Sequence, residues 1–423
     1  MNSTLPRLIP VRQKFPPSLP IDIQSSLRDQ FEFVRRSLKP GASVAVAVGS
    51  RGITGLSRVV GAVIEQLTEA GAQPFIVPAM GSHGGATPDG QIEILSEYGV
   101  TEKAMGVPIR ASLDVQKIGT TEDGVDVFFS SEALKADGVI VINRVKPHTD
   151  FSSDTLGSGI LKMLVIGLGK REGAANFHAA TTRFGYERVI RTAARLALQN
   201  TPILCGVALV ENQLHDTDTL AVLPREEIES KEAELFVRSK KLLPRLPFDE
   251  MDLLIVDQLG KNISGAGMDP NVTGRSVEGP STKLGGKDAG PVIRRLFVRD
   301  LTPETHGNAV GLGLADFATT RLVKGMDRNS TYINSLTALK PQTAKIPIHF
   351  DTDREVIERA LASLALADFR TARIVRIANT LSLEKLEVSE NYAEAIRARE
   401  DLEASDVAAE MRFDPEGNLF PLV

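Results

Sequence analysis

The stretch SVAVAVGSRG, residues 43–52, decides the fold. Its first six residues form a short apolar run, which is typical of a strand buried on both faces. A turn containing glycine closes the stretch, and apolar residues then recur at helical spacing from Leu56 to Leu67. Gly71 suits the end of that helix. A strand, a turn and a helix in this order predict the start of a βαβ unit.

The same alternation continues along the first half of the chain. The expected strands and helices are Phe75–Met80, a helix from Pro88 through Tyr98, Gly138–Ile142, a helix over 185–199, and Ile203–Val210. Buried strands that alternate with helices predict a mostly parallel sheet with helices on both faces.

A second α/β pattern follows a charged helix from Arg225 and the proline-rich residues 244–247. We therefore predict an α/β fold with two domains, residues 1–247 and residues 248–423. Each is expected to be a mostly parallel sheet flanked by helices, with an interdomain cleft. A charged amphipathic helix is expected over 391–404, free to pack back on the first domain.

Composition restricts the partners and the compartment. The chain has 423 residues, a net charge of −5 and scattered basic residues, which argues against nucleic acid or an anionic membrane. No apolar run approaches the roughly 18 residues of a spanning helix, and the start of the chain lacks a signal segment. The single Cys205 excludes an internal disulfide and a cysteine-based metal site. We expect a cytoplasmic protein with Cys205 in its core.

Three of the six histidines lie between residues 83 and 178, in unusual settings. His83 stands among glycines directly after an expected strand, and His148 ends the segment NRVKPH after another. His178 follows the segment AANF. Each could be an ordinary loop or helix-start histidine. Because chemistry in α/β proteins gathers where strands end, their joint placement predicts one site instead.

Lys162 lies within the apolar stretch ILKMLVI, which follows Gly157, Ser158 and Gly159. The simple interpretation is a lysine whose stem covers a helix face. The functional one is a covalent attachment point, because a buried ammonium is costly unless it is paired, deprotonated or modified. The three preceding residues would expose backbone N–H groups at a helix start, where a phosphate could bind.

These motifs resemble, as a set, those of the nickel-dependent lactate racemase family of 2-hydroxyacid racemases and epimerases. The matching residues, in order over 43–180, are Arg51, His83, His148, Lys162 and His178. Each motif alone is weak, whereas the set is specific.

The resemblance implies a nickel-pincer nucleotide, a pyridinium mononucleotide that holds nickel between two sulfurs and is tethered to Lys162. It implies His178 as the nickel ligand, His83 and His148 as paired acid/base groups, and Arg51 near the phosphate or the substrate carboxylate. It also implies a 2-hydroxy acid substrate and separate cofactor-biosynthesis proteins as partners. A homo-oligomer is compatible with all of this.

The chain departs from the family pattern at two places. The segment from Thr149 to Leu161 is longer than expected. In the second domain Arg275 and Lys261 are the candidates for binding the substrate carboxylate, and a substrate other than lactate is the expected consequence. Two alternatives remain: a hydrolase or lyase with three histidines on zinc or iron, and a nucleotide- or small-acid-binding protein without catalysis.

Overall fold

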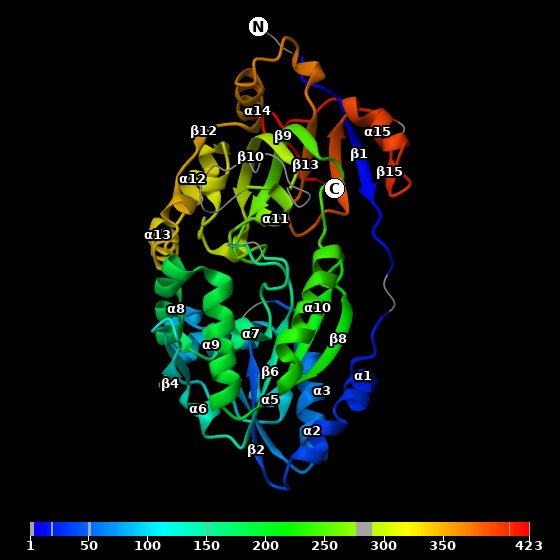
Figure 1. Cartoon of the computed structure of the whole chain (residues 1–423). Coiled ribbons are helices and arrows are strands. Elements are labelled where there is room, and N and C mark those ends of the chain that lie inside the picture. Colours follow the sequence, from blue (N-terminus) through cyan, green and yellow to red (C-terminus); the bar gives the residue numbers. More distant parts are fainter. Residues whose placement is uncertain are drawn as a thin grey trace. The chain divides into compact units, whose positions relative to one another are not determined.

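The computed structural model describes the chain except residues 1–3, 18, 19, 50, 51, 150, 152, 276–289, 406 and 423. The chain forms two compact units (Figure 1). Ser18–Leu243 is called here the histidine unit, and Met1–Pro17 with Pro244–Val423 the terminal unit. The division lies four residues before the expected end of the first domain at residue 247.

The histidine unit is built on a five-stranded sheet in the order β3-β2-β6-β7-β8. The strands are β2 (Ser43–Val48), β3 (Gln73–Pro78), β6 (Gly138–Arg144), β7 (Ile203–Glu211) and β8 (Thr217–Pro224). The first four run parallel, and β8 pairs antiparallel with β7. The prediction of a mostly parallel sheet flanked by helices is confirmed.

Alternate residues of these strands face opposite layers of helices, as the two-residue period of a strand requires. On one face Val46 and Ile140 pack with the first three helices, whereas on the other Ala47 and Val141 pack with the later ones. The first layer contains α1 (Ile23–Gln30), α2 (Glu32–Ser37) and α3 (Leu56–Glu69). The second layer contains α6 (Ser131–Leu134), α7 (Ile160–Lys162), α8 (Lys170–Phe184), α9 (Tyr186–Asn200) and α10 (Ile228–Lys241). Cys205 is fully buried in the first layer's core, as expected.

Smaller elements complete this unit. They are α4 (Pro88–Glu97), α5 (Glu102–Met105) and an antiparallel pair of strands, β4 (Val115–Thr120) and β5 (Asp126–Ser130). The sequence did not predict the strand pair, because its exposed face carries polar and charged residues and interrupts the apolar pattern.

The terminal unit has an eight-stranded sheet in the order β12-β11-β10-β9-β13-β14-β1-β15. The strands are β1 (Leu8–Gln13), β9 (Glu250–Leu259), β10 (Val292–Leu301), β11 (Phe317–Thr319), β12 (Ile348–Phe350), β13 (Ile374–Ile377), β14 (Lys385–Ser389) and β15 (Leu402–Ala404). In this order the strands from β12 through β11, β10 and β9 to β13 run parallel. The remaining neighbours, from β13 to β15, pair antiparallel. The α-helices among its described residues are α11 (Pro270–Thr273), α12 (Thr320–Gly325), α13 (Arg328–Thr337), α14 (Asp353–Ala362) and α15 (Ala393–Arg397).

Strand β1 places the start of the chain in the terminal unit, whereas we expected it in the first domain. Leu8 pairs with Ser389 of β14, and Val11 pairs with Ala404 of β15. Pairing on both sides satisfies the backbone donors and acceptors of β1 and buries Val11 in this unit's core.

The helix expected over 391–404 is also corrected. Its first part is the short α15, and its end is β15, which pairs with β1. Ile396 and Leu402 are buried in the core of the terminal unit, so this segment packs within its own unit.

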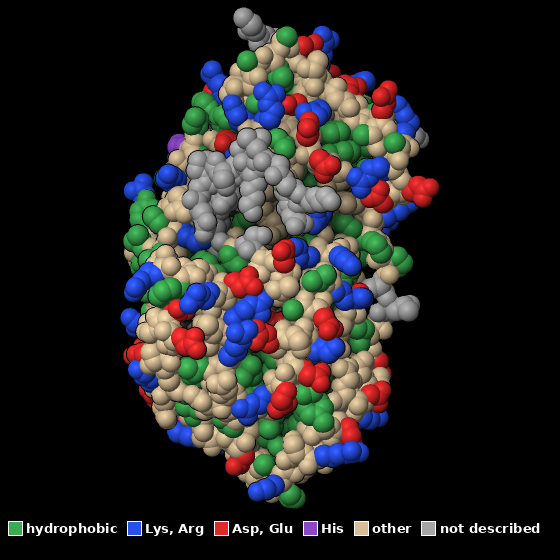
Figure 2. Space-filling view, in the orientation of Figure 1, with side chains coloured by type: hydrophobic (Ala, Val, Ile, Leu, Met, Phe, Trp, Pro, Cys, Tyr) green, Lys and Arg blue, Asp and Glu red, His purple; other side chains and the backbone are tan. Residues whose placement is uncertain are grey.

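Charge is spread over the surface. On the face drawn in Figure 2, basic and acidic side chains are interspersed. Among the described residues, none of the helices is both long enough and apolar enough to cross a membrane.

Candidate functional site

His148 and Lys162 are in direct contact. The loop after β6 is closed by Lys146 and Ser158, whose backbones exchange hydrogen bonds of 2.9 and 2.8 Å. Helix α7 begins two residues later and carries Lys162, whose Nζ contacts Nε2 of His148. An ammonium has donors only, so a protonated Lys162 uses this nitrogen as its acceptor. Both side chains are half-buried.

An aromatic series extends from His148. The ring of Phe151 stacks on His148 at 4.9 Å between centroids, and Tyr186 stacks on Phe151 at 5.0 Å. Phe151 lies in the segment from Thr149 to Leu161, which we expected to be longer than in the family. Its ring restricts the orientation of the His148 imidazole.

The series reaches His178 on α8. Phe177 lies 5.8 Å from Tyr186, edge to face, and 5.6 Å from the half-buried ring of His178. Three of the residues singled out from the sequence, His148, Lys162 and His178, are therefore joined by a chain of contacts within one unit.

The loop that carries His83 lies against the segment after Lys162. This segment is a π-helical turn, Met163–Gly167, and the N–H of Gly81 donates to the carbonyl of Gly167 at 3.1 Å. Gly81 has φ +60°, and a Cβ there would lie 3.3 Å from the carbonyl oxygen of Ile166, so this close approach favours glycine. His83 itself is exposed.

A buried carboxylate from α10 lies at the start of α7. Glu232 is 1% exposed, and its Oε2 accepts from the N–H of Leu161 at 3.0 Å. Burial raises the pKa of this carboxyl to about 7, although hydrogen bonds from the backbone of Leu161 and Ile160 act in the opposite direction.

Gly157, Ser158 and Gly159, which we expected to contact a phosphate, pack against this carboxylate and against Lys146. A Cβ at Gly159 would lie 2.5 Å from the Glu232 carboxyl carbon, and one at Gly157 would lie 2.3 Å from the Lys146 carbonyl oxygen. The N–H of Ser158 already donates to Lys146, and that of Leu161 to Glu232. These two donors are therefore engaged by the chain itself.

The remaining expected residues are Arg51, Lys261 and Arg275. Arg51 falls outside the described residues. Arg275, in the terminal unit, donates to the Asp316 carboxylate at 2.6 Å and to the Ile293 carbonyl at 3.2 Å. Lys261 donates to the carbonyl of Gly265 at 2.6 Å. Arg275 thus already has an anionic partner, which weakens its case as a substrate ligand.

Three contributors to this site were missed from the sequence: Phe151, Tyr186 and Glu232. Tyr186 and Glu232 act through partners remote in sequence, and no local pattern marks them.

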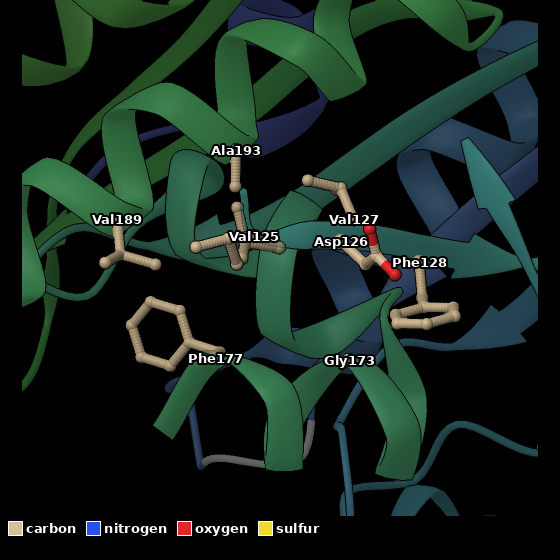
Figure 3. A pocket seen from close by; sticks show the side chains of 9 residues that line it. Val125, Asp126, Val127, Phe128, Gly173, Phe177, Val189 and Ala193 are labelled. Carbon is tan, nitrogen blue, oxygen red and sulfur yellow. The ribbon is translucent and has the colours of Figure 1, made fainter. Parts of the chain in front are cut away.

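A small apolar hollow lies beside α8 and α9 (Figure 3). Val125, Val165, Phe177 and Val189 are among the residues that line it, and none of the expected catalytic side chains does. Within the described part of the chain, no three His, Cys, Asp or Glu side chains form a group that could hold a metal ion.

Residues 23–187 match the family model described as the lactate racemase N-terminal domain. A solved structure, the lactate racemase apoprotein from Thermoanaerobacterium thermosaccharolyticum, is similar over 89% of this chain and 99% of its own, with 13% identity and a TM-score of 0.47. A likeness at that level carries no argument about activity. No curated protein matches the sequence significantly.

The match over residues 23–187 confirms the resemblance to the lactate racemase family noted from the motifs. This match supports a racemase type of isomerase in general terms.

Proposed function

We propose that this protein is a racemase or epimerase that acts at C2 of a 2-hydroxy acid, with His83 and His148 as paired acid/base groups. The observation that carries the proposal is the contact of Lys162 with His148, joined to His178 by an aromatic series, inside a domain of the lactate racemase family.

The residues fit a tethered nickel-pincer nucleotide. The Lys162 side chain is half-buried and directed at another candidate residue, which suits an amine that is to be covalently linked. The imidazole of His178 is a ligand type that nickel accepts. Lys162 would hold the nucleotide, and His178 would hold the metal. When bound, the cofactor supplies a hydride acceptor, which no side chain can be.

The chain's own contribution is proton transfer and orientation. Each stereoisomer presents its hydroxyl to a different side, so two bases are needed, and histidine titrates near neutral pH. A neutral imidazole carries a lone pair on one ring nitrogen, which is the state a base requires. Stacking on Phe151 restricts the ring plane during the transfer.

A cationic group must hold the substrate carboxylate while C2 is planar. Arg51 is the first candidate, with Lys261 and Arg275 in the terminal unit as further ones.

The same proposal includes a substrate other than lactate, partner proteins that make the cofactor, a cytoplasmic location and compatibility with a homo-oligomer.

The tether is tested by mass. Wild-type chain produced together with cofactor-biosynthesis proteins should bind nickel and carry added mass on the peptide that contains Lys162. Lys162→Ala should lack the added mass, whereas Lys103→Ala, which removes an exposed lysine of α5, should keep it. Unmodified Lys162 in a nickel-loaded, active wild-type chain would overturn the tether.

The acid/base pair is tested by turnover of 2-hydroxy acids and sugar acids labelled with deuterium at C2. His83→Ala and His148→Ala should each lower kcat by about 10²–10⁴-fold, the usual contribution of general acid–base catalysis. His349→Ala, in the terminal unit, is the matched control. Normal turnover in either of the first two variants contradicts the assignment.

A further inference from the structure

Lys170 is a buried cation that the proposed reaction leaves without a role. It is the first residue of α8, eight residues after Lys162 and eight before His178. Its side chain is fully buried, and burial lowers the pKa of its ammonium to about 8. Its backbone has φ +55°, a left-handed conformation that costs free energy in a residue other than glycine.

The ammonium group contacts the end of the strand that leads to His83. Nζ of Lys170 donates to the carbonyl of Pro78, the last residue of β3, and to Oε1 of Gln91 at 3.4 Å. Lys170, the first residue of the helix that carries His178, is thereby connected to β3, the strand that precedes His83.

Gln91 extends the connection to the His83 loop itself. Its side chain is fully buried on α4, and its Nε2 donates to the carbonyl of Gly81 at 3.0 Å and to that of His83 at 3.4 Å. The orientation of the amide is determined by its partners, because an ammonium only donates and carbonyls only accept. Lys170 therefore orients Gln91, which in turn holds the backbone on both sides of Ser82.

The loop needs such a restraint. Gly81, Gly84 and Gly85 all have positive φ, and residues 81–85 contain three glycines. Glycine gives the backbone several accessible conformations, so the direction of the exposed His83 side chain is not determined by local sterics. The carbonyls of Gly81 and His83 are the points at which α4 and α8 can limit that freedom.

We propose that Lys170 is a positioning residue for His83, acting through Gln91 and the Pro78 carbonyl to hold the glycine-rich loop in one conformation. The inference rests on the proposed function only in giving His83 a catalytic task. The restraint on the loop is a property of the chain without cofactor and is tested separately.

The restraint is tested by hydrogen exchange on the chain without cofactor. Lys170→Met keeps an unbranched side chain one atom shorter and removes its donors, and Gln91→Leu removes the amide. Both should raise amide exchange rates in residues 81–87 by about 10-fold or more, while protection in β2 and β6 is retained. Arg171→Met, which removes the exposed cation next in sequence, should leave the loop unchanged.

Unchanged exchange of the loop in both Lys170→Met and Gln91→Leu overturns the proposal. If Lys170→Met does not fold, Gln91→Leu alone decides, because Gln91 is the sole relay in the proposal to the Gly81 and His83 carbonyls. Increased exchange throughout the unit in the folded variants also overturns it, since that pattern indicates a general packing role.

In the cofactor-loaded enzyme, misplacement of His83 should lower kcat by about 10–100-fold and change KM less than twofold. In a His83→Ala background, Lys170→Met should cause no further loss, because the group it positions is gone. An equal further loss there contradicts the assignment. If wild-type chain shows no turnover at all, the proposed function fails, whereas the exchange result still decides the restraint.

Discussion

Both units bury charged side chains, but they surround them differently. In the histidine unit Lys170 and Glu232 form hydrogen bonds with backbone groups and an amide. In the terminal unit Arg299 lies between two carboxylates, Asp257 at 2.8 Å and Asp353 at 2.7 Å, and Arg376 also pairs with Asp257.

The difference separates two uses of buried charge. A network of opposite charges offsets much of its desolvation cost and specifies how the surrounding segments pack. A charge buried against backbone and amide dipoles alone has less of its desolvation cost offset. Its pKa is therefore shifted, as the pKa values of Lys170 and Glu232 are. Shifted groups of that kind gather at functional sites, and both of these hold segments that carry candidate catalytic residues.

The largest effect on stability is expected from breaking the terminal network. Asp353 is fully buried and accepts from Arg299, from Arg321 at 2.7 Å and from the N–H of Leu419 at 2.9 Å. Asp353→Ala leaves these donors without their carboxylate and should lower the free energy of unfolding by about 3–5 kcal/mol, as measured in urea. Glu403→Ala, which breaks an exposed pair with Lys14, is the control and should leave the midpoint unchanged.

In the same variant, exchange of the His83 loop should stay as in the wild type. A loosened loop in Asp353→Ala would show that the two kinds of buried charge are not independent.

The next effect is the pH dependence that Glu232 imposes. Its pKa is raised from 4.5 to about 7, so the folded chain holds this proton more tightly than the unfolded one. Stability is therefore lost as pH rises from about 4.5 through 7, by up to about 3 kcal/mol at 1.4 kcal/mol per unit.

Glu232→Gln should remove that slope, which urea titrations at several pH values between 4.5 and 8 would measure. The exposed Glu234, which pairs with Lys231 in the same helix, provides the control variant Glu234→Gln. A slope that survives in Glu232→Gln must come from other groups and would refute this account of α7.

The smallest effect is expected from the aromatic series. Phe151→Ala removes the ring that stacks on His148 and should cost about 1–2 kcal/mol of stability. It should also shift the imidazole resonances of His148 in NMR spectra, whereas Phe33→Ala, at an exposed position of α2, should not. Unshifted His148 resonances would show that the stacking does not orient the ring.

Local patterns were enough to predict the four parallel strands β2, β3, β6 and β7 of the histidine unit, because each is an apolar run bounded by turn residues. They were not enough for β1, whose partners β14 and β15 lie at the other end of the chain. Pairing between remote segments leaves no local signal, and this is why Met1–Pro17 was placed in the wrong domain.

The same limit applies to the candidate site. The motifs predicted that His148, Lys162 and His178 belong together, since strand ends and glycine turns mark them. Glu232 could not be found in that way, because it reaches the start of α7 from a helix some 70 residues later. Glycines 157 and 159 carried the signal of a close approach, and what approaches is the Lys146 carbonyl at Gly157 and the Glu232 carboxylate at Gly159.

The position of β1 between β14 and β15 has a consequence for biosynthesis. As the chain leaves the ribosome, β1 emerges first but its neighbours emerge last, whereas every strand of the histidine unit is available once residue 243 has appeared. Domains fold as units during synthesis, so the histidine unit can fold while β1 is still unpaired. Deleting the residues after Ile377 should leave that strand unpaired and prone to associate with other chains.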